Sequence, residues 1–596
     1  MKRSYNLAQA LELIWSPVEE EIDEEEPAEE EEEVSEEENI TENDEDYAPT
    51  DEEESSDEEE PADTENHFQS KNGNVVWSSI PPTDRRRMLG AERERSPRGP
   101  TRYAISRADS IKSTFHLFMS EEIEEVVLQM TNKEGRRVYG DKWDEMDKTQ
   151  LEGYLGLLIL AGVYKSSKES TFSPWHAQSG RAIFRATMPL KTFHILSRVI
   201  RFDDRDTRPT RRARDKLAAI REVWDKWLCR LPLMYNPGTD VTVDERLVPF
   251  RGRCAFKQYM PSKPGKYGIK IWVACDAQTS YAWNMQMYTG KPVDGQPEKN
   301  QGQRVVLEVT EGLRGHTITC DNFFTSYALG KELLKRKMAM VGTVRKNRPE
   351  LPPVLLATRE REKFSSQFVF TDTHALVSYC PKKRRNVLLM STLHRDTAVS
   401  SMEDKKPQIV LDYNKNKGGV DNLDKVTSVY SCKRMTARWP LVVFYNMLDV
   451  SAYNSFILWR EINPTWNQGK CHKRRLFLEE LGRELVTPLI NRRQVLPRTP
   501  ASACLKQTDP SKDDPADEYE VDRWKSSFLI DTVKSAVYHL LSIVIHKYRI
   551  DQCNGCKTHH PSQRQHERLD VLEDDFYKGH FYHSSPPALF HPFSVC

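Results

Sequence analysis

Cysteine is scarce in this sequence, and long apolar runs are absent. The eleven cysteines stand singly along 596 residues, except for the close pair Cys553 and Cys556. Such scatter excludes a disulfide framework and is typical of a protein in a reducing compartment. The first 16 residues are too polar for a signal peptide, and the most apolar later window, 535–545, is too short to cross a bilayer. We therefore expect no membrane association.

Basic residues are almost absent from the first 65 positions. These positions hold 30 Asp and Glu against Lys2 and Arg3, which leaves 85 basic and 60 acidic residues for the remainder. An arm of charge −28 thus precedes a body of charge +25. A basic body predicts a polyanionic partner such as DNA, and an acidic arm could shield it or bind a chromatin partner. Residues 17–66 carry almost no apolar side chains, so we expect them to be disordered.

The spacing of apolar residues predicts an α/β fold. Residues 112–239 show the helical period. After Pro237-Gly238 the period becomes that of strands, over 241–250, 267–275 and 281–289. A helix at about 302–314, a fourth strand ending at Asp321 and another helix follow. Three antiparallel strands, a helix, a strand and a helix is the order of a ribonuclease H-like core.

Acidic residues stand at special points of these elements. Asp244 lies inside the first strand and Asp321 ends the fourth, while Asp421 and Asp424 share one face of a later helix. Carboxylates gathered from separate elements suit Mg²⁺, and two such ions about 4 Å apart can drive phosphoryl displacement. Nearby Arg and Lys would then hold phosphates and not neutralise the acids. The alternative is that Asp244 forms an ordinary salt bridge and that Asp321 caps the following helix.

Several motifs together resemble those of piggyBac family transposases. They are "TVDERLVPFRGRCAFKQYMPSKPGKYGIKIWVACD", "TITCDNFFTS", "VGTVRKNRPELP", "YNKNKGGVDNLD" and "RWPLVVFYNMLDVSAYNSF". The resemblance runs from about 112 to 500. The resemblance implies a catalytic and metal-binding triad of Asp244, Asp321 and Asp421, with Asp424 as a further acid beside two Mg²⁺ ions. It also implies a nuclear homodimer that cuts and pastes transposon ends into double-stranded DNA at TTAA targets.

The resemblance also gives roles to the segments of the chain. The predicted segments are a disordered acidic arm and linker (1–111), a helical dimerisation and DNA-binding domain in two parts (112–239 and 426–497), a ribonuclease H-like core in two parts (240–347 and 409–425), a β-rich insertion (348–408), a linker (498–520) and an atypical tail (521–596).

Basic residues near the acids are the candidate DNA ligands. Those after the first strand are Arg251, Arg253, Lys257, Lys263 and Lys266, and those before a long helix are Lys433, Arg434 and Arg438, followed by Trp439. The cations could bind phosphate, and Trp439 could stack on an unpaired base. The alternative for Trp439 is that it packs in the core.

The tail departs from the family pattern. Family members usually end in a cysteine-rich module with two zinc ions, but the last 80 residues here contain only Cys553, Cys556 and Cys596 beside several histidines. One zinc on Cys553, Cys556, His560 and His566 is the candidate site, and a two-zinc module is excluded.

Two hypotheses for the function remain open. The complete set of acids favours an active Mg²⁺-dependent transposase. The altered tail favours a domesticated, non-catalytic DNA- or chromatin-binding protein, or a changed way of recognising transposon ends.

Overall fold

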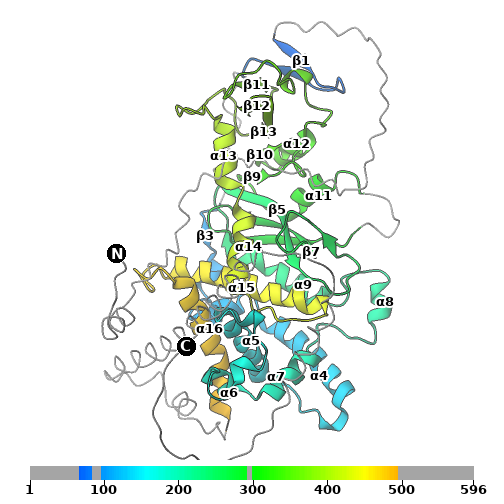
Figure 1. Cartoon of the computed structure of the whole chain (residues 1–596), viewed down its shortest axis with the longest axis vertical. Helices are drawn as coiled ribbons and strands as arrows, with labels where there is room; N and C mark the ends of the chain where they lie inside the picture. Colours follow the sequence, from blue (N-terminus) through cyan, green and yellow to red (C-terminus); the bar gives the residue numbers. More distant parts are fainter. Residues whose placement is uncertain (1–65, 83–95, 291–297, 494–596) are drawn as a thin grey trace, which may run out of the picture. The chain divides into compact units, whose positions relative to one another are not determined.

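The computed structural model describes residues 66–82, 96–290 and 298–493, which lie within one compact unit (Figure 1). Of residues 17–66, which were expected to be disordered, only Asn66 is described, and it is hydrogen-bonded to Ser79. The candidate zinc ligands of the tail lie outside the described residues.

Eleven strands of the described chain form one mixed sheet. In order across the sheet they are β1 (His67–Gln69), β2 (Val76–Ser78), β11 (Ser366–Phe370), β12 (Ala375–Lys382), β13 (Arg385–Ser391), β10 (Ala339–Thr343), β9 (Thr317–Cys320), β5 (Asp240–Pro249), β7 (Tyr267–Asp276) and β6 (Gln258–Tyr259), with β8 (Ala282–Met287) also paired to β7. Strands β5, β7 and β8 are antiparallel, whereas β9 and β10 run parallel to β5. The predicted α/β class is confirmed, and the strands expected at 241–250, 267–275 and 281–289 are present.

The three strands of the expected insertion continue the sheet of the core. β11, β12 and β13 form an antiparallel meander, and β13 pairs with β10 through Val341 and Ser391. Backbone hydrogen bonds between β13 and β10 therefore join the insertion to the core.

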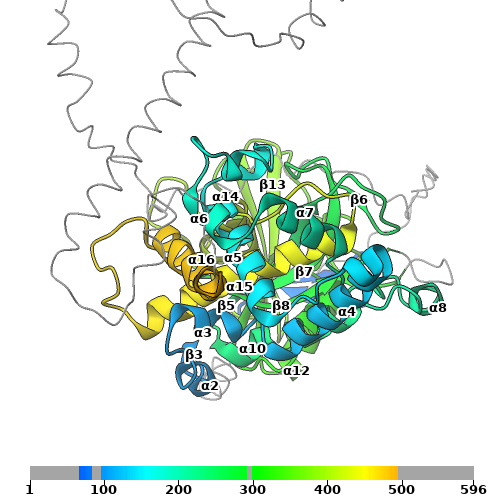
Figure 2. The same ribbon diagram turned by 90° about the horizontal axis from the view of Figure 1, so that it is seen from below.

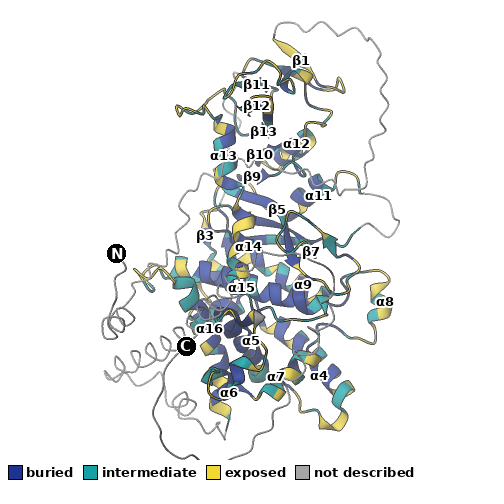
Figure 3. Ribbon diagram, in the orientation of Figure 1, coloured by how far each residue is buried: buried dark blue, intermediate teal, exposed yellow. Residues whose placement is uncertain are grey.

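Helices cover both faces of this sheet. On one face lie α13 (Gln408–Asn416) and α14 (Gly419–Val429), and α11 (Gln301–Val309) and α12 (Tyr327–Lys335) also pack on the sheet. Neighbouring residues of β10 show the two faces: Val341 packs in the cluster with Ile409 of α13, while Met340 joins the main core with Leu333 of α12. Burial on both faces explains why these strands read as nearly continuous apolar runs (Figure 3).

The remaining helices form a second layer that contains segments from both ends of the described chain. Its helices are α2 (Arg102–Ile105), α3 (Ile111–His116), α4 (Glu121–Tyr139), α5 (Lys148–Val163), α6 (Ala182–Thr187), α7 (Leu190–Val199), α8 (Arg208–Arg212), α9 (Arg221–Leu228), α10 (Arg230–Met234), α15 (Trp439–Ile462) and α16 (Lys473–Arg492), with short 3₁₀ turns at Gly140–Lys142, Ser166–Lys168 and Ser173–Trp175. Another 3₁₀ turn, Pro353–Leu355, precedes β11 in the insertion. A two-stranded sheet of β3 (Gly99–Pro100) and β4 (Tyr235–Asn236) lies beside them.

Helices α5 and α16 pack side by side although they are far apart in the sequence (Figure 2). A Cβ on Gly156 would lie 2.9 Å from the carbonyl oxygen of Gly482, so glycine permits this close approach. Helix α15 is long and apolar enough to cross a membrane, but 94% of its apolar window is buried inside the protein, as in a core helix.

A hairpin of β1 and β2 corrects part of the prediction for residues 1–111. Its strands extend the sheet beyond β11, where Ser78 pairs with Phe370. Trp77 is fully buried, and its indole N–H donates to the carbonyl of Glu350 at 2.9 Å. Val75 is buried beside it and Phe68 of β1 packs against the same core, so a few apolar side chains order this stretch, and composition alone did not reveal this.

We expect Trp77→Ala to release this hairpin. The substitution removes about 3–5 kcal/mol of packing, so cleavage within residues 66–82 should become at least about 100-fold faster in limited proteolysis. Val76→Ala is the matched control, because Val76 is 54% exposed on the same strand. Equal cleavage of the Trp77 variant and the wild type would contradict this packing role.

Candidate active site and nucleic-acid interface

The register of two parallel strands brings Asp244 and Asp321 together. Val243 of β5 lies opposite Cys320 of β9, and each strand continues with an aspartate. Strand β9 ends there, because the Asp321 carboxylate accepts a hydrogen bond from the Phe323 N–H at 2.9 Å and turns the chain. Adjacent register positions thus deliver two carboxylates to one point of the sheet.

Three carboxylates meet at this point. Asp244, Glu245 and Asp321 each offer an oxygen, and these oxygens lie within 4.8 Å of one another. Oxygen ligands of this kind suit a hard cation such as Mg²⁺. Glu245 was missed by the sequence analysis, because adjacent residues of a regular strand point to opposite faces. The only sign of its role in the sequence was that it directly follows Asp244.

Neither structural alternative for the two aspartates holds. Helix α12 is capped by Ser326, whose hydroxyl accepts from the Leu329 N–H at 3.1 Å, so Asp321 is not its cap. Among the ion pairs of the described residues, none includes Asp244.

Crowding of like charges makes this site hard to ionise. Burial, followed by the charges of Glu245 and Asp321, raises the pKa of Asp244 well above its ordinary value, although Lys263 opposes the shift. A bound cation would reduce this repulsion between the carboxylates, so the cluster favours the binding of a cation.

Asp421 approaches the cluster because α14 begins directly on β5. The Thr242 hydroxyl donates to the carbonyl of Asn416 at 2.5 Å, and a Cβ on Gly419 would lie 2.6 Å from that hydroxyl oxygen. Asp421 lies in the first turn of α14 and pairs with Lys263 at 3.1 Å. Burial disfavours the charged form of Lys263, but Asp244, Asp421 and Glu245 outweigh it and raise the pKa of this ammonium group.

Asp424 has a different partner. Its carboxylate lies 2.6 Å from the guanidinium of Arg246, whose side chain is only 4% exposed. We expected the basic residues near the acids to hold phosphate; in this structure, which contains no DNA, Arg246 faces Asp424 and Lys263 faces Asp421. A buried guanidinium needs a carboxylate partner, so Arg246 binds the acid that faces it.

Apart from Lys263 and Trp439, the candidate DNA ligands fall into two groups. Arg251, Arg253 and Lys266 are exposed, and no side-chain hydrogen bond or ion pair is found for them within the described ranges. The others bind backbone: Lys257 donates to Gly252 at 3.3 Å, Lys433 to Pro249, Arg434 to Ser166 and Arg438 to Arg198 at 2.9 Å. These cations therefore also position the loops that carry them.

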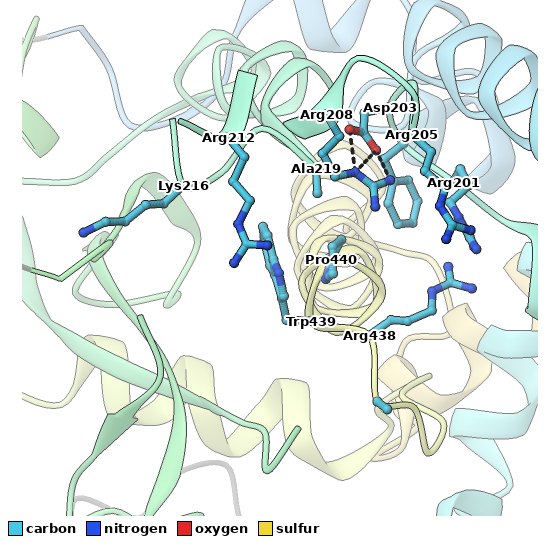
Figure 4. A pocket seen from close by; sticks show the side chains of 12 residues that line it. Arg201, Asp203, Arg205, Arg208, Arg212, Lys216, Ala219, Arg438, Trp439 and Pro440 are labelled. Atoms are coloured by element: carbon cyan, nitrogen blue, oxygen red, sulfur yellow. Dashed lines mark hydrogen bonds and ion pairs between the residues drawn. The ribbon is translucent and has the colours of Figure 1, made fainter. Parts of the chain in front are cut away.

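Arg438 and Trp439 border a basic pocket of about 360 Å³ at the first turn of α15 (Figure 4). Its other charged lining residues are Arg201, Asp203, Arg205, Arg208, Arg212 and Lys216. Asp203 is already bound to Arg208 at 2.5 Å, so the pocket keeps an excess of positive charge. Burial and the charge of Arg201 lower the pKa of Arg438 to about 10. The sequence signal for this pocket was the Arg-rich run 201–216.

The pocket borders the connector that follows β5. Trp439 contacts Phe256 edge to face at 5.1 Å between ring centroids, and it is partly buried against the core. A Cβ on Gly252 would lie 3.0 Å from the carbonyl oxygen of Ala437. Since Lys263 of the same connector reaches Asp421, the connector links the pocket to the acidic cluster.

Comparisons identify the family. The family model described as "Transposase IS4" (DDE_Tnp_1_7) matches residues 112–456, more than half of the chain. A cryo-EM structure of a piggyBac transposase synaptic complex with hairpin DNA is 33% identical, with a TM-score of 0.65, and covers 71% of this chain and 91% of that chain. This chain belongs to the piggyBac family of transposases. The resemblance drawn from the sequence is confirmed.

Human piggyBac proteins are also similar. PiggyBac transposable element-derived protein 3 of Homo sapiens is 23% identical over 363 residues, 56% of this chain and 59% of that protein. PiggyBac transposable element-derived protein 2 of Homo sapiens is 22% identical over 375 residues, 58% and 61% respectively. This piggyBac chain thus spans about three fifths of the length of these relatives.

We expect Asp244→Asn to stabilise the metal-free protein. An acid whose pKa is raised by folding costs stability once the pH exceeds its unfolded pKa, so removing the charge should add about 1 kcal/mol at neutral pH. Burial also raises the pKa of Asp424, but Asp424→Asn should still be destabilising, because the buried guanidinium of Arg246 would keep only the Thr427 hydroxyl as a partner. Urea unfolding in EDTA measures both, and destabilisation by Asp244→Asn would refute the crowded-charge account.

Proposed function

We propose that this protein is a metal-dependent DNA transposase that cuts and joins strands at the acidic cluster. The meeting of Asp244 and Asp321 at the end of parallel strands, with Asp421 at the start of α14, supports this most directly. The strand order β8-β7-β5-β9-β10 is that of a ribonuclease H-like core, which supports it further.

The proposed chemistry assigns a role to each acidic or basic side chain of the site. Two Mg²⁺ ions would supply activation of the attacking oxygen and stabilisation of the leaving oxygen. Asp244, Asp321 and Asp421 would hold them, and Glu245 adds a carboxylate beside them. Asp424 would act through Arg246, because this pair fixes α14 against β5. When DNA binds, the ammonium group of Lys263 would leave Asp421 and bind a substrate phosphate instead.

Double-stranded DNA is the proposed partner. The similar piggyBac structure is a synaptic complex with hairpin DNA, and this chain has a basic pocket and connector leading to its acids. Phosphates would bind Arg251, Arg253, Lys266 and the pocket arginines. TTAA targets, binding of transposon ends, a homodimer and nuclear localisation are parts of this proposal that rest on the family.

A domesticated, non-catalytic DNA- or chromatin-binding protein is the second candidate. The human relatives are named as transposable element-derived proteins, which favours it. Strand cleavage separates the two, because both require DNA binding and only the first requires the acids.

We expect Asp244→Asn, Asp321→Asn and Asp421→Asn each to reduce Mg²⁺-dependent nicking and joining of DNA by more than about 100-fold. This exceeds the usual effect of removing a group that merely supports a metal ligand. Asp144→Asn, which alters an exposed acid between helices, is the control. Full activity in any of the three variants would exclude that residue from the site, and wild-type binding without cleavage would favour the second candidate.

We expect Arg212→Ala to weaken binding to duplex DNA of any sequence. The slope of log K for DNA binding against log salt concentration should become smaller in magnitude by about one. Within the described chain, Arg212 has no side-chain hydrogen bond or ion pair to lose, so its removal should leave the fold intact. Arg314→Ala is the matched control, because Arg314 is exposed before β9, at the strand end opposite Asp321. An unchanged slope for Arg212→Ala, measured by anisotropy across a salt series, would remove the pocket from the DNA interface.

A further inference from the structure

We infer that the helical layer contains a second metal site, built from His116, Glu124 and Glu152, that binds a transition-metal dication such as Zn²⁺. These residues come from the end of α3, the first turn of α4 and the first part of α5. The inference goes beyond the proposed transposase activity and does not depend on it, since none of the three belongs to the catalytic carboxylate cluster.

The three ligand atoms have the spacing of a metal site. Nε2 of His116 lies 3.4 Å from Oε1 of Glu124 and 3.6 Å from Oε1 of Glu152, and all three atoms lie within 4.8 Å of one another. Ligands at zinc-like bond lengths in a tetrahedron are about 3.3 Å apart. The observed spacing therefore leaves room for one ion between the three side chains.

Two of these atoms lack hydrogen-bond partners. Nε2 of His116 and Oε1 of Glu124 are both buried, and neither makes a hydrogen bond in the described structure. The Glu124 side chain is only 2% exposed and points this oxygen at His116. Leaving these two buried polar atoms without partners is costly, and a cation between them would remove this cost.

The surrounding charges orient the two glutamates. Lys112 lies 2.8 Å from Oε2 of Glu152, and Lys148 lies 3.7 Å from Oε2 of Glu124. Each glutamate thus gives one oxygen to a lysine and turns the other toward His116. A carboxylate that gives its second oxygen to a neighbouring cation, as Glu152 does to Lys112, is typical of metal ligands held by a second layer of contacts.

The local charge also matches a dication. Glu121 pairs with Lys148 at 2.9 Å, and Glu484 of α16 accepts from the backbone N–H of Lys112 at 2.8 Å. Four carboxylates therefore surround two ammonium groups, which leaves a net charge of about −2 for a neutral imidazole.

The donor set determines the class of metal. One imidazole and two carboxylates suit Zn²⁺ and similar first-row dications, whereas Mg²⁺ and Ca²⁺ prefer oxygen ligands alone. His116 is 25% exposed, so an ion can reach the site from solvent. A metal here would fasten α3, α4 and α5 together, and through Lys112 it would add α16.

Zinc analysis of the full-length protein tests the inference. The parent should carry Cys553→Ser and Cys556→Ser, which remove the paired thiols of the tail. We expect one zinc per chain in this parent and in His194→Ala, a control for an exposed histidine on α7. His116→Ala, Glu124→Gln and Glu152→Gln should each raise the Kd for zinc by more than about 100-fold. Co²⁺ bound to the parent should show visible absorption without a thiolate charge-transfer band.

Melting temperature provides a readout independent of metal content. Added Zn²⁺ should raise the melting temperature of the parent and of His194→Ala but not that of Glu152→Gln, which keeps the shape of the side chain. The inference is overturned if the parent binds no zinc, or if the three ligand variants retain as much as the parent. In either case a proton on His116, bridging the two glutamates, supplies the positive charge.

Discussion

The repulsion between carboxylates held at one point of the sheet is the constraint on which the site depends. The parallel register of β5 and β9 places Asp244 beside Asp321 whether or not a cation is present. That register is fixed by fully buried neighbours, Val241 and Val243 on β5 and Ile318 on β9, because a slip of one residue would exchange this apolar set with the buried threonines Thr242 and Thr319 of the other face. Core packing therefore sustains an arrangement that electrostatics alone would disperse.

The surrounding cations reduce this cost without removing it. Lys263 faces Asp421 and Arg246 faces Asp424, so each carboxylate of α14 has its own partner, whereas Asp244 is left among acids. Because the cationic partners are distributed unequally, the acids have different roles. The ion pairs of Asp421 and Asp424 attach α14 to the sheet, and Asp244, which has no ion pair among the described residues, is the acid that a bound cation would relieve most.

The sequence predicts those features that follow from local pattern. The strands around Asp244 and Asp321 follow from alternation and apolar runs, and the pairing of the two acids follows from strand order. Glu245 was not predicted as a site residue, because alternation along a strand places it on the face opposite Asp244, and β5 keeps an unbroken register with β7 through both residues. The pocket around Arg438 was also missed, since it joins the run 201–216 to a helix more than two hundred positions later. Trp77 was overlooked because one aromatic residue hardly changes the composition of a polar stretch.

The insertion shows how the third acid can lie so far along the chain from the second. The chain leaves the core after β10, forms β11 and β12, and returns as β13 antiparallel to β10. Because β13 lies next to β10, α13 starts at the edge of the core and α14 can begin on β5, where Gly419 permits contact with Thr242. Strands added between β10 and β13 therefore need not move Asp421, provided that the β10–β13 pairing is kept. The geometry of the acids constrains only the two strands at which the insertion joins the core.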